Sequence, residues 1–495
     1  MQMDRITDFY EKTGRLFQGG FLILRKDEVT GSGGRFLSLI HQRFEKVHVG
    51  DFVALIAPGT TWFTLQSDDV TFLVIGDVFD NDGDAVEDRL RALTKGDLIA
   101  NLGNTDLGGR HAIVAITEGD LLVANDPFGS RSVHYCTGTR VAVASHAALL
   151  AHQFGMPRDK ATTAFVNAPQ YLDRIVCYLP GHRTVYRNIR RLPPNHVYSA
   201  RFGGIARFWP HKPCEETTRE QLFDRFDAAL NALRTFVVAR YTPVISITGG
   251  VDTRSVLTAF HNTGTPFTGV TWRDLNYTRQ EAEVVSTIAE KTGCAHLYIS
   301  QTRTDGDLLD ICAAYNAGDI FRAAPRGVLM DKVRAEIANR PDAKEVLPPA
   351  FLIGYGGEIV RGFYRKGKRG PEHGFNVQTM IDLYGVASRK HGTDKAYSAY
   401  AAAAFREFYQ AARFDPRSLK GFDPNDVFYW EHRMAMWATP TMETIDLAMP
   451  CLVGLNSRKL YETAIGLPVE QRMSKEIILS YIRSRSPELG AIQVI

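Results

Sequence analysis

The residues best suited to chemistry form a short loop at residues 246–254, Ser-Ile-Thr-Gly-Gly-Val-Asp-Thr-Arg, where an apolar run ends and a helical pattern begins. Backbone N–H groups and the helix dipole converge at such a junction and favour an anion. Paired glycines can take positive φ and let the main chain approach a phosphate. Thr248 and Thr253 add hydroxyl donors, and Asp252 adds a carboxylate of the kind that binds Mg²⁺. The loop predicts a phosphate and magnesium site; the alternative is an ordinary turn in which Thr253 caps the helix.

The elements around this loop alternate between strand and helix. The run PVISIT reads as a strand, and residues 253–264 read as a helix. Another strand, FTGVTW, leads to a second helix that opens with the capping-box spacing of Thr278 and Glu281 and ends at Gly293. A third strand, HLYIS, follows. This order predicts a parallel sheet covered by helices, and the rest of the carboxyl-terminal half reads as mainly helical.

The amino-terminal half has a different pattern. Between residues 51 and 198, short runs rich in Val and Ile alternate with Gly, Pro, Asn and Asp, as in DFVALIAPG, TFLVIGDVF, GGRHAIVAI, DLLVANDPFG and RVAVASH. Such runs are typical of strands in a mostly antiparallel sheet structure. Residues 85–94 and 146–154 read as helices between them. This half is therefore expected to form antiparallel sheets with a few helices.

We expect two domains, residues 1–210 and 217–495. The stretch between them contains Pro210 and Pro213 and has no clear period. After it, Thr217 and Glu220 have capping-box spacing and are predicted to open a long amphipathic helix.

The composition excludes several classes of protein. With 495 residues, 44% hydrophobic and 23% charged, the chain has ample apolar material for large cores. A net charge of only +3 argues against a dedicated nucleic-acid binder. No apolar run is long enough to span a membrane, and the first residues lack the apolar region of a secretory signal. The six cysteines, including Cys312, form no CxxC pair, so neither a zinc site nor a disulfide framework is indicated. We expect a cytoplasmic protein.

The loop resembles the [ST]GGxD[ST] pyrophosphate loop of the N-type ATP pyrophosphatases, and the wider sequence resembles one branch of them, asparagine synthetase and β-lactam synthetase. The other matching segments are Gly293-Cys294-Ala295-His296, Gly354-Tyr355-Gly356-Gly357-Glu358, Ala448-Met449-Pro450, Lys475-Glu476-Ile477-Ile478-Leu479 and, in the amino-terminal half, residues 125–135 and 184–195 with Arg207-Phe208-Trp209. The resemblance implies an α/β fold: an N-terminal Ntn-hydrolase-like αββα sandwich and a C-terminal adenine-nucleotide α-hydrolase-like parallel sheet with helical additions.

The resemblance also implies an ATP and Mg²⁺ site. The expected metal ligands are Asp252 and Glu358, although Glu358 stands where the family usually has Asp. Arg254 replaces the small residue that often follows the loop, and its expected role is to reach a phosphate or a substrate carboxylate; a plain helix-face arginine is the alternative. The full set of expected ATP-binding residues is Ser246, Thr248, Gly249, Gly250, Asp252, Thr253, Arg254, Thr271 and Gly354.

The candidate catalytic residues are Tyr355, Glu431 and Lys475. Tyr355 stands where β-lactam synthetases carry a Tyr that works with a Glu to deprotonate the attacking amine, and Glu431 is the candidate partner. A Tyr near pKa ~10 is a poor base without such help. Lys475 matches the Lys-x-x-Leu helix of the family rather than the catalytic lysine near the carboxyl end. A basic run, Arg361, Arg365, Lys366, Lys368 and Arg369, is read either as a lid over triphosphate or as a solvated loop.

The family's glutaminase domain needs Cys directly after the initiating Met, whereas this sequence begins Met1-Gln2-Met3. We therefore expect no glutamine hydrolysis. The expected function is an ATP-dependent, AMP-forming amide ligase that acts on a small-molecule or peptide carboxylate and an amine. The expected setting is specialised metabolism, such as antibiotic biosynthesis, and one expected assembly is a homodimer. The alternatives are ammonia-dependent amidation of the asparagine-synthetase kind, a lasso-peptide-type macrocyclase, a tRNA-modifying adenylase and a non-catalytic scaffold.

Overall fold

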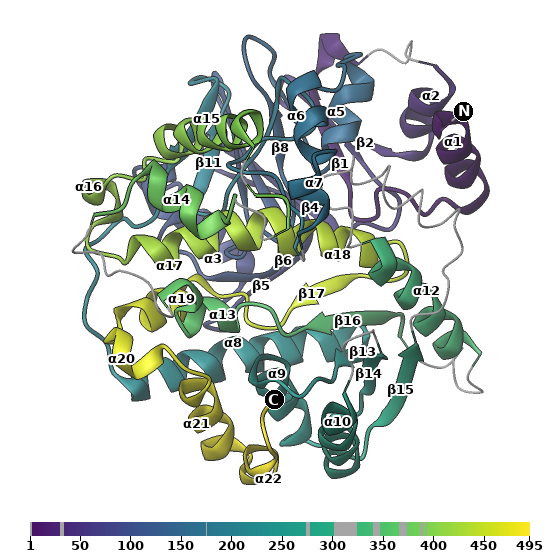
Figure 1. Ribbon diagram of the computed structural model, residues 1–495. Helices are drawn as coiled ribbons and strands as arrows, with labels where there is room; N and C mark the ends of the chain where they lie inside the picture. Colours follow the sequence, from purple (N-terminus) through teal and green to yellow (C-terminus); the bar gives the residue numbers. More distant parts are fainter. Residues whose placement is uncertain are drawn as a thin grey trace.

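A computed structural model describes residues 2–29, 34–174, 176–273, 278–300, 324–339, 347–365, 374–386, 390–392 and 394–495. Two antiparallel sheets occupy the upper half of the molecule in Figure 1, and one parallel sheet occupies the lower half. We call residues 2–207 the antiparallel part and residues 219–495 the parallel part. The predicted α/β class, antiparallel sheets followed by a parallel sheet, is confirmed.

The antiparallel part contains two six-stranded sheets in which every strand pair is antiparallel. The first has the spatial order β10 (Ile189–Arg191), β8 (His134–Cys136), β9 (Ala142–Ala144), β1 (Phe21–Arg25), β3 (Phe52–Ile56) and β2 (Glu45–Val49). The second has the order β12 (Gly204–Arg207), β11 (His196–Ser199), β7 (Asp120–Asn125), β6 (Leu107–Thr117), β5 (Val70–Asp80) and β4 (Trp62–Ser67).

Alternation along the strands explains how these sheets stack. In β1, Phe21 and Ile23 point to a core that also contains Ile75 of β5 and Val114 of β6, so this core lies between the sheets. Leu22, the intervening residue, belongs to the core on the other face. That outer face is covered by α1 (Gln2–Thr13), α2 (Arg35–Arg43) and α5 (Ala147–Gln153), while α3 (Val86–Leu93) and α8 (Arg219–Arg240) pack on the second sheet. The αββα sandwich is confirmed.

The parallel part is built on a five-stranded sheet in the order β15 (Ala295–Ser300), β14 (Thr268–Arg273), β13 (Thr242–Ser246), β16 (Pro349–Ile353) and β17 (Cys451–Val453). All four strand pairs are parallel. After β13, the chain adds β14 and then β15 on one side of that strand. The later strands β16 and β17 lie on its other side. The carboxyl ends of β13 and β16 therefore flank a topological switch point, the usual place for a ligand in such a sheet. The sequence patterns predicted β13, β14 and β15 but not β16 or β17.

The predicted start and end signals of the helix α10 (Arg279–Thr292) are confirmed. Thr278 accepts a hydrogen bond from the Glu281 N–H (3.1 Å) and precedes α10, and Gly293 ends that helix with φ +62°. The start of α8 was predicted one residue too early: its capping box joins Thr218 to Gln221. Thr217 instead donates a hydrogen bond to the Thr463 carbonyl at 2.7 Å, which fastens the segment before α8 to a neighbouring helix.

The helices that cover the parallel sheet and join it to the antiparallel part are α9 (Val251–His261), α10 (Arg279–Thr292), α12 (Ala324–Ala338), α13 (Gly357–Val360), α14 (Val377–Tyr384), α15 (Lys395–Ala411), α16 (Pro416–Leu419), α17 (Pro424–Phe428), a π-helix (Tyr429–Ala438), α18 (Thr439–Ile445), α19 (Arg458–Gly466), α20 (Val469–Arg472), α21 (Glu476–Arg485) and α22 (Pro487–Ala491). Shorter helices of the antiparallel part are α4 (Leu98–Leu102), α6 (Lys160–Val166) and α7 (Pro169–Leu172), and 3₁₀ turns occur at Lys26–Glu28 and Phe363–Arg365. Across the described ranges, no helix is both long and apolar enough to cross a membrane.

Candidate functional site

The glycine loop joins the carboxyl end of β13 to the amino end of α9. Thr248 and Thr253 hydroxyls lie 2.8 Å apart, and the Gly250 N–H donates to the Thr248 hydroxyl at 3.3 Å, so the loop is folded on itself. Neither Gly249 nor Gly250 adopts a positive φ, which differs from the expected reason for the glycines. Gly250 precedes α9 and supplies no side-chain cap, so N–H groups of the first helical turn remain available to an anion.

A second loop follows β16 and packs directly on the first. A Cβ on Gly354 would collide with the backbone of Thr253, and a Cβ on Gly357 would collide with the Asp252 carboxylate. Gly356 between them has φ +104°, a conformation that favours glycine. The Gly-x-Gly-Gly pattern is therefore explained by close approach of the two loops at the switch point.

This approach brings the two predicted metal ligands to one place. Arg361, from the end of α13, lies between them, with its Nη2 3.1 Å from the Asp252 carboxylate and 3.9 Å from that of Glu358. Burial, followed by the charge of Asp252, raises the pKa of Glu358 to about 7, and Arg361 opposes this rise. Burial lowers the pKa of Arg361, but the two carboxylates outweigh it and raise that pKa.

The donor set fits Mg²⁺. Glu358 Oε2 is buried and has no hydrogen-bond partner among the described residues, and the charge of Asp252 acts on this carboxylate. Two hard carboxylates in mutual repulsion are relieved by a divalent cation, and Mg²⁺ in nucleotide sites commonly takes one or two carboxylates plus phosphate oxygens. Across the described residues no cluster of three or more His, Cys, Asp or Glu side chains is suited to a metal, so a metal held here would depend on such additional ligands.

Arg254 contacts the carboxyl-terminal segment of the chain. Its side chain is fully buried, and its guanidinium donates to the carbonyls of Ile492 (2.6 Å), Gln493 (2.9 Å) and Gly249 (3.2 Å). The Ile495 N–H also donates to the Gly249 carbonyl at 3.1 Å, and Figure 1 shows this end of the chain beside α9. Arg254 thus ties residues 489–495 to the glycine loop, a contact that the sequence patterns did not predict.

Three other predicted residues occupy supporting positions. Thr271, near the end of β14, donates to the Ile247 carbonyl at 2.8 Å and lies 2.9 Å from His296 Nε2, so it fastens the loop to the neighbouring strand. Ser246 is buried at the end of β13. Lys475, just before α21, donates to the Ile495 carbonyl and belongs with the carboxyl-terminal segment.

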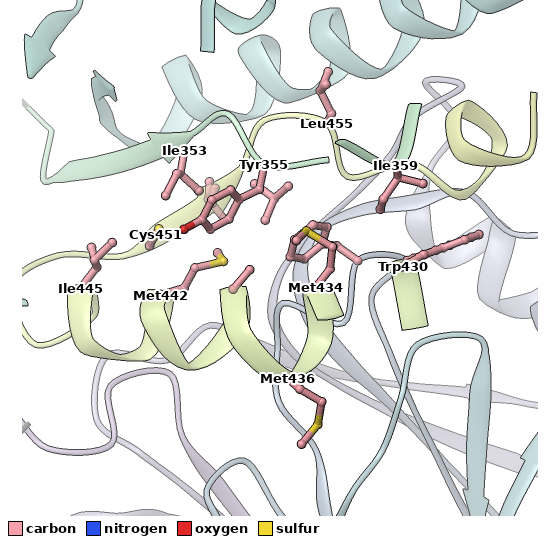
Figure 2. Packing of buried hydrophobic residues seen from close by; sticks show 14 of the residues in the cluster. Ile353, Tyr355, Ile359, Trp430, Met434, Met436, Met442, Ile445, Cys451 and Leu455 are labelled. Carbon is pink, nitrogen blue, oxygen red and sulfur yellow. The ribbon is translucent and has the colours of Figure 1, made fainter. Parts of the chain in front are cut away.

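The Tyr355 side chain lies in the core between the two parts. Its ring stacks on Phe128 of the antiparallel part at 6.2 Å and lies 5.6 Å from the ring of Trp437. Figure 2 shows the ring among apolar side chains, with its hydroxyl directed toward Cys451.

Glu431 is held by partners other than Tyr355. Its two carboxylate oxygens accept hydrogen bonds from Arg207 at 2.6 and 2.7 Å, and Asn195 donates a third at 3.1 Å. The pair is buried and joins the last strand of the antiparallel part to the π-helix. The predicted Tyr355–Glu431 pair is therefore not formed in this structure.

The sequence patterns did not single out Arg433, two residues after Glu431. Its charge opposes the rise in the pKa of Glu358, and its buried Nε has no hydrogen-bond partner in the part of the chain that the structure describes. Five aromatic rings surround the guanidinium at 5.5 to 5.9 Å, those of Tyr178, Phe363, Tyr364, Tyr429 and Trp437. The signal available in the sequence was a cation in an aromatic run. Arg433 lies in the π-helix, a form frequent at functional sites.

Of the predicted basic lid, only Arg361 has a described side chain, and it lies inside the site. The described residues do not include the rest of this basic run, namely Lys366, Lys368, Arg369 and the side chain of Arg365. They also do not include Cys312.

No family model and no curated protein matches this chain. Among solved structures it is similar to an allosteric regulatory enzyme of purine biosynthesis, with 13% identity and a TM-score of 0.23 over 56% of this chain and 64% of that one, less than two thirds of its length. It is also similar to a glutamine phosphoribosylpyrophosphate amidotransferase from B. subtilis complexed with ADP and GMP, with 12% identity and a TM-score of 0.24 over 79% of this chain and 91% of that one. At these TM-scores neither similarity assigns an activity.

Proposed function

We propose that this protein is an ATP-dependent, AMP-forming ligase that adenylates a substrate carboxylate and couples the acyl group to an amine. The observation that carries the proposal is the convergence of Asp252 and Glu358 at the switch point of the parallel sheet, beside the uncapped amino end of α9. A glycine loop, a helix amino end and two carboxylates are what a metal-bound triphosphate needs.

In this reaction a substrate carboxylate oxygen attacks the α-phosphorus of ATP and pyrophosphate leaves. The amide groups at the start of α9 and the hydroxyls of Thr248 and Thr253 would hold the leaving pyrophosphate. Asp252 and Glu358 would hold Mg²⁺, which neutralises the leaving group when it is bound. Arg361 supplies fixed positive charge next to these carboxylates, and the charge of Arg433 acts on Glu358.

The amine then attacks the acyl carbon, AMP leaves, and the amine loses a proton. The Tyr355 hydroxyl is proposed to relay this proton, taking it from the amine while its own proton passes to solvent, because it lies on the same loop as Glu358. Glu431 is not assigned to this step, since its carboxylate is bound by Arg207.

The proposed amine source is a substrate rather than glutamine. The two cysteines of the antiparallel part, Cys136 and Cys177, are both buried, and burial raises the pKa of Cys136 to about 12. A protonated, enclosed thiol is a poor nucleophile, which supports a glutamine-independent ligase acting on a small-molecule or peptide substrate.

The test is ATP–pyrophosphate exchange with a panel of carboxylic acids, preceded by calorimetric titration of Mg²⁺-ATP. Asp252→Asn should abolish tight Mg²⁺-ATP binding, whereas Asp88→Asn, an exposed aspartate on α3 whose side chain is 73% accessible, should not. Acid-dependent exchange would support the proposal. Release of ADP and phosphate would contradict the adenylate mechanism, and Mg²⁺-ATP binding that Asp252→Asn leaves unchanged would contradict the site. Amide formation from ammonium alone would instead favour the ammonia-dependent alternative.

A further inference from the structure

A second cavity lies at the opposite edge of the parallel sheet from the glycine loop. Its lining includes Tyr241, which precedes β13, and Cys451, which begins β17, so it sits at the amino ends of these strands. The antiparallel part supplies the other wall, through Asp77 of β5 and Arg110 of β6. Its volume is about 240 Å³, far more than the share of one water molecule. The site described above lies at the carboxyl ends, so the two are separate.

The cavity is lined by hydrogen-bond donors that lack acceptors. Arg110 Nη2, Arg131 Nε and Thr60 Oγ1 are all buried and without a partner in the described residues. Buried donors of this kind are rare, because each loses its hydration without recovering a hydrogen bond. One acceptor, Asp446 Oδ2, also has no hydrogen-bond partner within the described ranges. A bound group must therefore offer chiefly acceptors.

Positive charge in the cavity exceeds negative charge. Arg15 and Arg334 both pair with Asp331, at 2.7 and 2.9 Å. Arg110 pairs with Asp446 at 2.5 Å.

Arg131 makes no ion pair within the described residues. Asp77 carries the remaining carboxylate of the lining, and it accepts hydrogen bonds from the hydroxyls of Tyr241 (2.9 Å) and Thr61 (3.2 Å). Burial and the charge of Arg110 lower the pKa of Arg131, although the carboxylates of Asp446, Asp77 and Asp126 oppose this. An arginine buried under these conditions is unfavourable in the empty protein.

The backbone next to Arg131 is fixed by a dense set of contacts. Asp126 accepts hydrogen bonds from the Arg131 N–H (2.7 Å) and from Ser130 N–H and hydroxyl (3.0 and 2.9 Å), and Asn456 of the parallel part donates to it at 2.8 Å. A Cβ on Gly19 would collide with the Arg131 guanidinium, so that glycine makes room for it. The arginine is held toward the cavity rather than left to reach solvent.

We propose that this cavity binds a small oxyanion, a carboxylate or a phosphate group, between Arg131, Arg110 and Thr60. The planar donor array of an arginine matches both chemistries. A ligand that also carries a donor would satisfy Asp446. This proposal does not depend on the ligase activity, because none of these three residues belongs to the switch-point site.

The test uses the full chain without nucleotide, titrated separately with inorganic phosphate and with succinate and followed by calorimetry and thermal denaturation. Saturable binding of phosphate, of succinate or of both supports the site and identifies the preferred chemistry. Arg131→Gln should weaken that binding at least tenfold, while Arg140→Gln, whose side chain is 42% accessible, should leave it unchanged. Phosphate bound at the glycine loop instead would persist in Arg131→Gln, and such persistence would count against the cavity.

Two further readouts separate binding from folding. Arg131→Gln should keep or raise the melting temperature of the ligand-free protein, because it removes an unpaired buried charge, and should abolish the ligand-induced rise. Thr60→Val, nearly the same in shape, should weaken binding severalfold without changing the fold. Absence of saturable binding of either anion at millimolar concentration, or equal binding by wild type and Arg131→Gln, would overturn the proposal.

Discussion

The Arg361 guanidinium lies 3.1 Å from the Asp252 carboxylate and 3.9 Å from the Glu358 carboxylate, at the point where the loops after β13 and β16 meet. One cation thus occupies the region between two carboxylates that come from motifs about a hundred residues apart in the sequence. Arg361 offsets only one of these two negative charges, and any divalent ion that binds here must compete with it for the carboxylates.

Replacing Arg361 should therefore strengthen the binding of a divalent ion by itself. We expect Arg361→Gln to bind Mn²⁺, a probe for Mg²⁺, severalfold more tightly than wild type, because the two carboxylates lose their competing cation. Calorimetric titration without nucleotide measures this. Arg240→Gln, an exposed arginine at the end of α8, is the control, and unchanged affinity in Arg361→Gln would place the metal elsewhere.

Glu358 should make the metal-free protein less stable as the pH rises. Its pKa of about 7 in the folded protein exceeds the ordinary value of 4.5, so the folded state binds more protons than the unfolded state between these values. Stability attributable to this group is then present below pH 4.5 and lost as the pH rises through 7. Glu358→Gln should be more stable than wild type at pH 8, by at most about 3 kcal/mol, and nearly equal to it near pH 4.5. Urea unfolding at both pH values checks this, and a difference independent of pH would contradict it.

Arg254 should control the docking of the carboxyl-terminal segment. Arg254→Ala leaves the carbonyls of Ile492 and Gln493 without their donor, a loss of about 1–3 kcal/mol. We expect faster digestion of residues 489–495 by carboxypeptidase, followed by mass spectrometry. Arg254→Lys keeps the charge but loses the several N–H donors of the guanidinium, so its rate of digestion should lie between those of the wild type and Arg254→Ala. Equal digestion of all three would show that the segment is held by other contacts.

Glu431 should be a structural residue. Breaking its buried pair with Arg207 by Glu431→Gln should destabilise the protein by about 3–5 kcal/mol, because the guanidinium is left uncompensated. The double variant Arg207→Met/Glu431→Met should recover much of this loss. Chemical denaturation of the wild type and of these two variants decides the matter. A stable Glu431→Gln that exchanges pyrophosphate but forms no amide would restore the catalytic role predicted from the sequence.

Tyr355→Phe separates the two half-reactions. The ring contacts with Phe128 and Trp437 need no hydroxyl, so the fold and the pyrophosphate exchange should stay within about twofold of wild type. Amide formation should fall at least tenfold, since general-base assistance commonly contributes that much or more. If both rates are unchanged, Tyr355 is a packing residue only.

The sequence alone predicted what local patterns determine. Apolar runs broken by turn residues predicted β3, β5, β6 and β7, and the strand–loop–helix order around residues 246–254 predicted a parallel sheet with an anion site at its edge. Capping signals located α10 correctly and α8 to within one residue. These features depend on neighbours a few positions apart, so a single sequence reveals them.

The tertiary structure decided which distant residues meet. The β16 strand returns to the other side of β13, creates the switch point and places Glu358 beside Asp252, the two residues that the sequence predicted as metal ligands. The same packing paired Glu431 with Arg207, turned Arg254 to the carboxyl-terminal segment and enclosed Arg131 in a cavity between the two parts. Each of these partners lies far away in the sequence, and burial, which fixes charge pairing, is a property of the assembled fold rather than of any local pattern.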